Sequence, residues 1–263
     1  LVFKMYSNES KGERFPAMAG TISWDSTGNG SSQNYGVYNK CGYNNPNQTA
    51  PNGNAEFVFS GRSIYPEYLS DTNVLTCPSD AGARTEVSVN RRWEDQNNPG
   101  QIDPCAFTAE SYMYLGWAIN GRPGHDYLVT GGDENNTQDI DGAFVAELIG
   151  VVNGQQSVSP IDSDNRYDND IDYTNSASVA QTLYRTREGI ERFFITDINN
   201  AAASTEAQST IPVMGDLLST TVSEYNHIPG GANWLYMDGH VGFLKYKEGF
   251  PATAAFAFLV SQF

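Results

Sequence analysis

The stretch HIPGGANWLYMDGH at residues 227–240, which continues as VGFLKY, predicts a β-hairpin. Residues 234–237 and 241–246 are short apolar runs of strand-forming composition. Between them stands the pair Asp238 and Gly239, which favours a two-residue turn with positive φ angles. The end of the chain is therefore expected to contribute two antiparallel strands.

The same stretch holds two of the three histidines of the chain. His227, Asp238 and His240 offer two imidazoles and a carboxylate, the ligand set of a transition-metal site or of an acid–base pair. Because no metal-binding or nucleophile motif accompanies them, we interpret them as structural. Asp238 then serves the turn, and His227 fixes the preceding loop through a hydrogen bond to a backbone group or a carboxylate. The structural motif consists of His227, Gly230, Gly231, Asp238, Gly239 and His240. No catalytic residue is assigned.

The composition bounds the class of protein. The 263 residues are 39% hydrophobic and 17% charged, which is typical of one large globular domain. The 31 acidic and 15 basic residues give a net charge of −16, which argues against binding nucleic acid or an anionic membrane through a basic patch. No segment has the ~18 consecutive apolar residues of a membrane-spanning helix.

Three cysteines, Cys41, Cys77 and Cys105, allow one disulfide and leave one thiol over. The pairings Cys41–Cys77 and Cys77–Cys105 both stay open. Their spacing contains no CxxC unit, which argues against a zinc site made of cysteines. We expect one structural disulfide and hence an oxidising compartment.

The pattern of apolar residues predicts an α+β fold, in which a helix is followed by scattered antiparallel strands and long loops. Helices are expected at residues 1–10, 66–70, 141–152 (capped by Asp141), 176–188, 201–207 and 252–263. Besides the hairpin, strands are expected at residues 55–59, 73–77, 110–120, 193–198 and 211–214. Residues 23–54 and 157–174 are expected to be loops. Because the chain opens inside a helical pattern without an N-cap, residues 1–11 are expected to be the end of a truncated helix.

Two acidic segments are candidates for calcium binding. The carboxylates of Asp168, Asp170 and Asp172 stand at alternating positions, with Asp162 and Asp164 upstream, and such oxygens can surround a hard cation. The spacing is not that of an EF-hand. A second candidate is the acidic segment at residues 133–142. Solvated acidic loops without a cation are the alternative for both segments.

Three stretches together resemble the type IV pilin-like proteins. They are LVFKMYSNESKGERFP at residues 1–16, NVLTCPSD at 73–80 and NHIPGGANWLYMDGHVGFLKY at 226–246. More narrowly, the chain is similar to the prepilin-type proteins of Planctomycetes, Verrucomicrobia and Lentisphaerae, whose C-terminal signature is a histidine, nine residues and Asp-Gly. Here ten residues separate His227 from Asp238, a departure of one residue.

The resemblance implies a single pilin-like domain over residues 1–263, with an N-terminal helix packed on an antiparallel sheet. Residues 17–64 and 81–172 would be insertions, residues 188–246 the signature region and residues 252–263 a terminal helix. It also implies a non-catalytic subunit of an extracellular or periplasm-spanning filament, of the type IV pilus or type II secretion kind. Pseudopilins of type II secretion hold calcium near the sheet, which favours calcium as the cofactor.

The implied partners are other pilin or pseudopilin subunits, which would assemble through a missing N-terminal helix. Contact with a membrane would occur only through that helix. The implied location is secreted, at the cell surface or in the periplasm, with a precursor in the inner membrane. Two alternatives remain: a surface-anchored module that binds a glycan or other ligand through its aromatic-rich loops, and a metal-dependent enzyme that uses His227, Asp238 and His240.

Overall fold

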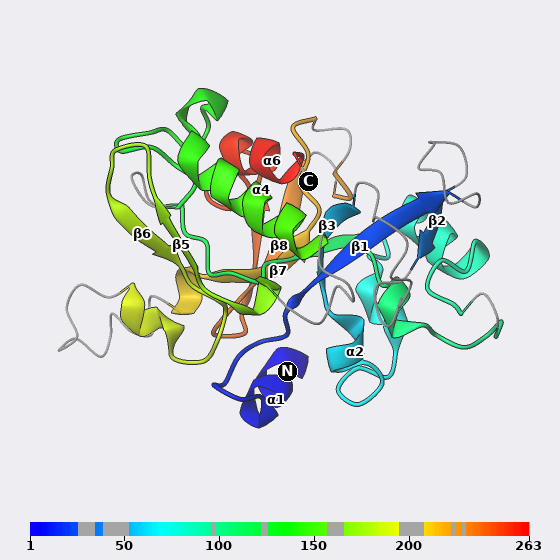
Figure 1. Ribbon diagram of the computed structural model, residues 1–263. Helices are drawn as coiled ribbons and strands as arrows, with labels where there is room; N and C mark the ends of the chain where they lie inside the picture. The colour runs from blue at the N-terminus through cyan, green and yellow to red at the C-terminus, as the bar shows by residue number, and fades with distance from the viewer. Residues whose placement is uncertain are drawn as a thin grey trace.

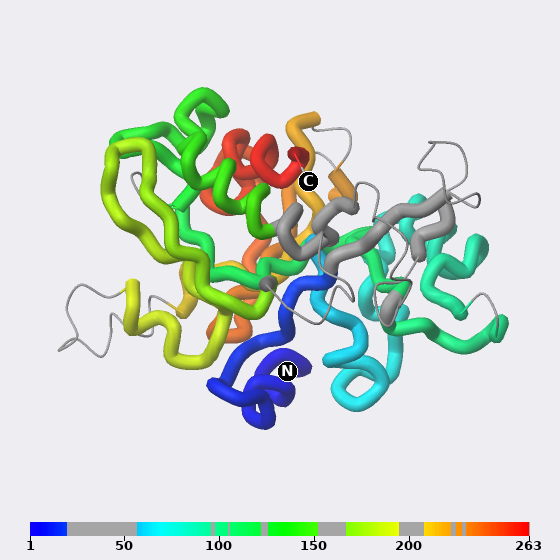
Figure 2. Tube along the Cα trace, viewed as in Figure 1, coloured from blue at the N-terminus to red at the C-terminus, as the bar shows by residue number. Residues whose placement is uncertain are grey.

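The computed structural model describes most of the chain. The described residues are 1–25, 35–38, 53–95, 98–121, 126–156, 166–194, 208–221, 225–227 and 230–262. Figure 2 traces the chain from the N-terminal helix at the bottom of the view to the C-terminal helix at the top. Within these ranges, no helix combines the length and the apolar character needed to cross a membrane.

A four-stranded antiparallel sheet lies at the centre of the fold (Figure 1). Its strands, in spatial order, are β4 (Tyr112–Tyr114), β7 (Pro212–Asp216), β8 (Gly231–Tyr236) and β9 (Val241–Lys245). The pairing of β8 with β9 is the hairpin expected from the sequence, and β7 contains the strand expected at 211–214.

The turn of the hairpin differs in detail from the prediction. Asp238 does not have a positive φ; Gly239 does, with φ of 94°. The amide of Gly239 donates to the carbonyl of Tyr236 at 2.9 Å, and the amide of Tyr236 donates to the carbonyl of His240 at 3.0 Å. The loop therefore has three residues, a tight turn closed by a left-handed glycine, rather than two.

A second sheet occupies a segment that was expected to be loop. β1 (Met18–Asp25) lies between β2 (Tyr35–Tyr38) and β3 (Gly53–Phe59), and both pairings are antiparallel. The strand expected at 55–59 belongs to this sheet, whereas the expected loop at 23–54 contains parts of all three strands. The polar composition hid them because it lacks the apolar alternation of a half-buried strand.

A two-stranded sheet replaces the helix that was expected at residues 176–188. β5 (Ile171–Thr174) pairs with β6 (Ala180–Leu183) in an antiparallel hairpin, seen at the left of Figure 1. The apolar residues of this segment also fit a helical face, but pairing with β5 decides the conformation. The acidic loop expected at 157–174 accordingly ends in a strand.

The described helices are α1 (Val2–Glu9), α2 (Gly61–Ile64), α3 (Ala81–Arg84), α4 (Gly142–Gln156) and α6 (Ala254–Val260). Among the described residues, α4 is the one helix longer than eight residues. Helical turns occur at Thr72–Leu75, Thr85–Val89, Pro104–Ala106, Thr137–Asp139, Arg166–Asp168 and Ile190–Phe193. The helices expected near both chain ends and after Asp141 are confirmed.

Four local predictions change. The helix expected at 66–70 lies earlier, as α2, and the strand expected at 73–77 is the 3₁₀ turn at Thr72–Leu75. The strand expected at 110–120 is limited to β4. Of the strand expected at 193–198, residue 193 ends a 3₁₀ turn and residues 195–198 lie outside the described ranges, as does the helix expected at 201–207.

Helices cover the two faces of the central sheet. Because side chains alternate along a strand, Trp234 and Leu235 of β8 point to opposite faces. The Trp234 ring contacts Phe256 of α6, with ring centroids 6.4 Å apart. Tyr114, which shares a row with Leu235 across β7, contacts Phe3 of α1 at 5.1 Å. The first and last helices therefore pack on opposite faces of one sheet.

The segment after α1 is fixed by Arg185, whose side chain is fully buried. Its guanidinium donates to the carbonyls of Phe15 and Pro16 at 2.7 and 2.8 Å and also to that of Gly116. Lys4 of α1 forms an ion pair of 2.7 Å with Glu188. The fold is thus a mixed α+β arrangement of antiparallel sheets and helices, and its N-terminal helix in the described residues is the eight-residue α1.

Candidate functional site

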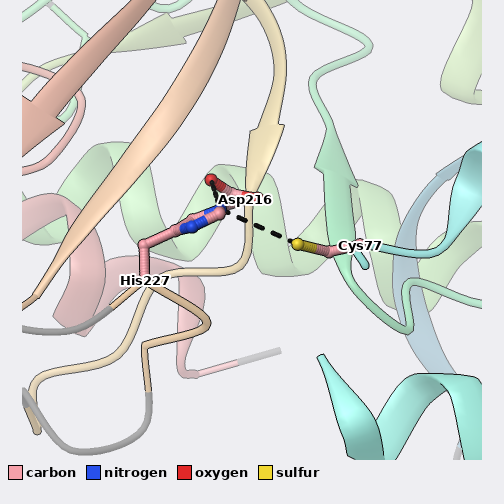
Figure 3. A group of neighbouring side chains, drawn as sticks. All are labelled: Cys77, Asp216 and His227. Atoms are coloured by element: carbon pink, nitrogen blue, oxygen red, sulfur yellow. Dashed lines mark hydrogen bonds and ion pairs between the residues drawn. The ribbon is translucent and has the colours of Figure 1, made fainter. Parts of the chain in front are cut away.

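Three chemically reactive side chains meet at the end of β7 (Figure 3). Cys77 follows the 3₁₀ turn at Thr72–Leu75, Asp216 is the last residue of β7, and His227 precedes β8. Their ligand atoms all lie within 4.8 Å of one another, and no other such group of three occurs in the part of the chain that the structure describes. We call these three residues the Cys–Asp–His cluster.

The Cys77 segment is held against the sheet by local hydrogen bonds. The Cys77 amide donates to Oγ of Ser111, next to β4, at 2.9 Å. The Ser111 hydroxyl in turn donates to Oδ2 of Asp80 at 3.1 Å, and Asp80 also caps α3 through the Ala83 amide. The Cys-Pro-Ser-Asp segment is therefore anchored at both of its ends, which places the thiol over the sheet.

One ring nitrogen of His227, Nε2, faces the three polar side chains around it. This atom lies 3.2 Å from Oδ2 of Asp216, 3.0 Å from Nδ2 of Asn233 and 3.7 Å from Sγ of Cys77. The Gly230 amide donates to the His227 carbonyl at 2.8 Å. Of the two partners expected for His227, a backbone group or a carboxylate, a carboxylate lies beside the ring: Asp216, at ion-pair distance.

Asp216 is the most enclosed member of the cluster. Only 1% of its surface is exposed, and its Oδ2 accepts from the amide and the side-chain nitrogen of Asn233 at 2.6 and 3.0 Å. Its other oxygen, Oδ1, is buried and has no hydrogen-bond partner. A buried carboxylate oxygen without a donor is costly, because a charged group loses its hydration there.

Tyr112 of β4 stands beside the cluster, opposite Asp216 in the strand register. Burial, followed by the negative charges of Cys77 and Asp216, raises the pKa of the Tyr112 phenol to about 12. The phenol is therefore neutral at physiological pH and presents a hydroxyl, not a phenolate, to the cluster.

The geometry does not suit a nucleophile–base relay. In such a relay the histidine uses one ring nitrogen for the nucleophile and the other for the carboxylate that orients it. Here Nε2 faces both the thiol and the carboxylate. Three donor atoms that face a common point are the arrangement of a ligand set.

The structure does not bring His227, Asp238 and His240 together. His227 precedes β8 and the other two follow it, so the six residues of the strand, about 20 Å at ~3.3 Å per residue, lie between them. Asp238 and His240 contact each other instead, with Oδ1 and Nδ1 2.7 Å apart on the surface. The His240 ring also stacks on Tyr236 at 4.4 Å.

The aspartates expected to bind calcium have protein partners. Asp168 pairs with Arg14 at 2.8 Å, Asp170 with Arg187 at 3.1 Å, and Asp172 accepts from the Thr182 hydroxyl at 2.7 Å. In the described residues their oxygens do not form a group of three within 4.8 Å. Asp162 and Asp164 lie outside the described residues, and calcium binding remains a prediction that no described contact supports.

The second acidic segment is used for local structure. Oδ1 of Asp141 accepts from the amides of Ala143 and Phe144 at 2.9 and 3.2 Å, which confirms the predicted cap of α4. Oδ2 of Asp141 accepts from the Ser176 amide at 3.0 Å. Asp139 accepts from the amide of Asp133 at 2.8 Å. These carboxylates therefore stabilise turns of the backbone.

The cysteine pairing requires a correction. Cys77 is a buried free cysteine, so neither Cys41–Cys77 nor Cys77–Cys105 is formed in this structure. The physical reason is its position, because its sulfur faces His227 across the end of the sheet. Cys41 and the side chain of Cys105 lie outside the described residues.

An apolar cavity of about 470 Å³ adjoins the cluster. It lies between the start of α1 and the face of the central sheet that carries Met214 and Leu235. Tyr112 and Asn233, which flank the cluster, also line this cavity. The cluster thus lies next to an open apolar space.

Comparison with known proteins gives no assignment. No protein-family model matches the chain, and neither a curated protein nor a solved structure gives a significant match.

Proposed function

We propose that this chain is a non-catalytic structural subunit of an extracellular or periplasm-spanning filament of the type IV pilin-like kind. The observation that carries the proposal is the packing of α1 on the face of an antiparallel sheet. Phe3 of α1 contacts Tyr114 of β4, in the central sheet, at 5.1 Å. It also contacts Phe59 of β3, in the three-stranded sheet, at 5.6 Å. An N-terminal helix on such a sheet is the arrangement that the resemblance implies.

The two internal stretches that carry the resemblance also meet in space. Cys77 comes from the Cys-Pro-Ser-Asp stretch and His227 from the C-terminal stretch, 150 residues later, and their side chains lie 3.7 Å apart. The residues that resemble the family therefore form one structural unit at the end of β7. This supports a role for the signature in the architecture of the subunit.

A filament subunit needs a surface that a neighbour covers. Leu1, Val74 and Val241 line the apolar cavity and are 93%, 58% and 63% exposed. Apolar side chains gathered at a hollow are typical of a surface buried by association. We assign this surface to an apolar segment of a neighbouring copy of the same protein.

The proposal places the protein at the cell surface or in the periplasm, with other subunits of the same kind as its partners. The net charge of −16 then keeps the exposed part of each subunit soluble and gives no basic surface for nucleic acid.

The test is assembly of the complete gene product in the cells that make it. Surface appendages are sheared off and labelled with an antibody to residues 1–263 under the electron microscope. We expect label along filaments for the unaltered protein and its loss for Val241→Asp, which puts a charge at the apolar hollow. Val89→Asp is the matched control, because Val89 is 70% exposed and is not among the residues that line the hollow.

Two results contradict the proposal. One is the absence of the unaltered protein from every sheared filament. The other is equal assembly of Val241→Asp and Val89→Asp when both fold. Binding to a glycan array, without assembly, favours the alternative of a surface-anchored binding module.

A further inference from the structure

We propose that the Cys–Asp–His cluster binds a zinc ion through Sγ of Cys77, a carboxylate oxygen of Asp216 and Nε2 of His227. This inference does not rest on the proposed function. It follows from the donor types, their spacing and an unpartnered buried oxygen.

The donor types select the metal. Thiolate, imidazole and carboxylate are the protein ligands of Zn²⁺, whereas Ca²⁺ and Mg²⁺ take oxygen ligands. A thiolate together with an imidazole excludes the hard cations and favours a borderline ion. The expectation from spacing, that the cysteines form no zinc site among themselves, is unaffected, because one cysteine takes part here.

The spacing fits a tetrahedral ion. With Zn–N near 2.0 Å, Zn–O near 2.0 Å and Zn–S near 2.3 Å, tetrahedral angles place nitrogen and oxygen about 3.3 Å apart and nitrogen and sulfur about 3.5 Å apart. The corresponding distances from Nε2 of His227 are 3.2 Å to Oδ2 of Asp216 and 3.7 Å to Sγ of Cys77. The third distance, from Oδ2 of Asp216 to Sγ of Cys77, is within 4.8 Å, and the Asn233 side-chain nitrogen, 3.0 Å from Nε2, must give way to the ion.

An independent observation points to a cation. Oδ1 of Asp216 is buried, belongs to a residue with 1% exposure and has no hydrogen-bond donor. Next to this carboxylate lies the thiol of Cys77, which is itself buried. A divalent ion supplies the positive charge that two buried anionic ligands require.

Neighbouring residues orient the three ligands, and one side of the cluster is open to solvent, so that an ion can enter. Asn233 donates twice to Asp216, and Ser111 accepts from the Cys77 amide, so the carboxylate and the thiol segment are both positioned. His227 is 27% exposed and forms the outer side of the cluster. Three protein ligands leave one position of a tetrahedral ion for water.

The ion would join three separate segments of the chain. Cys77 lies ahead of α3, Asp216 ends β7 and His227 belongs to the loop before β8. Metal binding to the folded chain stabilises it, because the unfolded chain does not preform the site. The expected role is to fix the loop before β8 against the sheet.

The first experiment uses the untagged protein, purified without chelator, and elemental analysis. We expect about one zinc per chain. After metal removal, added Zn²⁺ should raise the melting temperature by about 5–10 °C at a free concentration near 100 times Kd, whereas Ca²⁺ should not. Co²⁺ should give an intense near-ultraviolet band from thiolate coordination.

Variants assign the ligands. Cys77→Ser should abolish the thiolate–cobalt band, and His227→Gln should weaken zinc binding at least tenfold in a competition with a chromophoric chelator. His240→Gln is the matched control, because His240 also contacts an aspartate but lies on the surface. It should bind zinc as the unaltered protein does.

Three results overturn the proposal: no zinc binding by the unaltered protein, cobalt binding without a thiolate band, or equal loss of zinc in His240→Gln and His227→Gln. The cobalt spectrum of the unaltered protein keeps the test decisive if a variant fails to fold. Because none of these measurements uses filaments, failure of the zinc site and failure of the filament proposal are distinguishable.

Discussion

Replacement of the buried Arg185 by methionine tests how the N-terminal segment is held. Methionine keeps most of the aliphatic stem but removes every donor of the guanidinium. The guanidinium donates to the carbonyls of Phe15, Pro16 and Gly116. The substitution therefore separates hydrogen bonding from packing.

The magnitude follows from which carbonyls keep another donor. Pro16 keeps the Tyr114 hydroxyl at 2.7 Å, and Gly116 keeps the amide of Thr186 at 3.0 Å. The Phe15 carbonyl keeps no donor among the described contacts. One orphaned buried carbonyl costs about 1–3 kcal/mol, and the lost charge-assisted bonds add about 1.5–3 kcal/mol. Arg185→Met should thus lower the free energy of unfolding by about 3–5 kcal/mol.

The assay is chemical and thermal unfolding followed by circular dichroism. At about 2–4 °C per kcal/mol, the melting temperature should fall by about 6–20 °C. Arg192→Met is the matched control, because Arg192 is exposed and should change the free energy by less than about 0.5 kcal/mol. If Arg185→Met stays within about 1 kcal/mol of the unaltered protein, release of the desolvated cation offsets the lost bonds and the reasoning is wrong.

Three further perturbations test particular turns and contacts. Burial raises the pKa of Asp141, but hydrogen bonds from Ser176 and from the first turn of α4 outweigh it and lower the pKa below 3.8. The ionised carboxylate therefore stabilises the fold fully above pH 3.8, and this stabilisation is lost as the pH falls through the lowered pKa. Asp141→Ala should cost about 1–2 kcal/mol at pH 7, and thermal melts should show the difference closing as the pH falls below 3.8 and through the lowered pKa. Gly239→Ala should cost about 1–2 kcal/mol in urea unfolding, because the residue has φ of 94° while its added Cβ meets nothing within 4 Å; an unchanged midpoint would contradict the left-handed turn. Gly215→Ala should cost about 1–3 kcal/mol in the same assay, since its Cβ would lie 2.3 Å from the Trp234 ring, and full stability would show that the sheet repacks there.

Structural elements whose conformation depends on a few consecutive residues were predictable from the sequence. The hairpin around Gly239 and the cap at Asp141 depend on a few consecutive residues, so local chemistry determines them. The segment 176–188 was not predictable from periodicity, because Val179, Ala180 and Leu183 fit a helical face as well as a strand. Its pairing with β5 at Ile171–Thr174 decides between the two.

The candidate site was predictable only in part. His227 was expected to contact a backbone group or a carboxylate, and a carboxylate lies beside its ring, but Asp216 carried no sequence signal because it stands in an ordinary strand. Cys77 was interpreted through the other cysteines, although its neighbour is His227, 150 residues away. Sequence spacing cannot show such contacts, since the sheet register creates them. The one usable signal was that Cys77 and His227 both lie in stretches that resemble the same family.

The ion pair between Lys4 and Glu188 has a consequence for synthesis of the chain. Its partners are 184 residues apart, and β4 likewise waits for β7 to be made. At about 5–20 residues per second, the ribosome takes on the order of 10–40 s to proceed from Lys4 to Glu188. During that interval Phe3 can meet Phe59 of β3, but the central sheet that carries Tyr114 is incomplete. Part of the apolar surface of α1 therefore waits for the last third of the sequence, which supplies β7, β8 and β9, before the central sheet covers it.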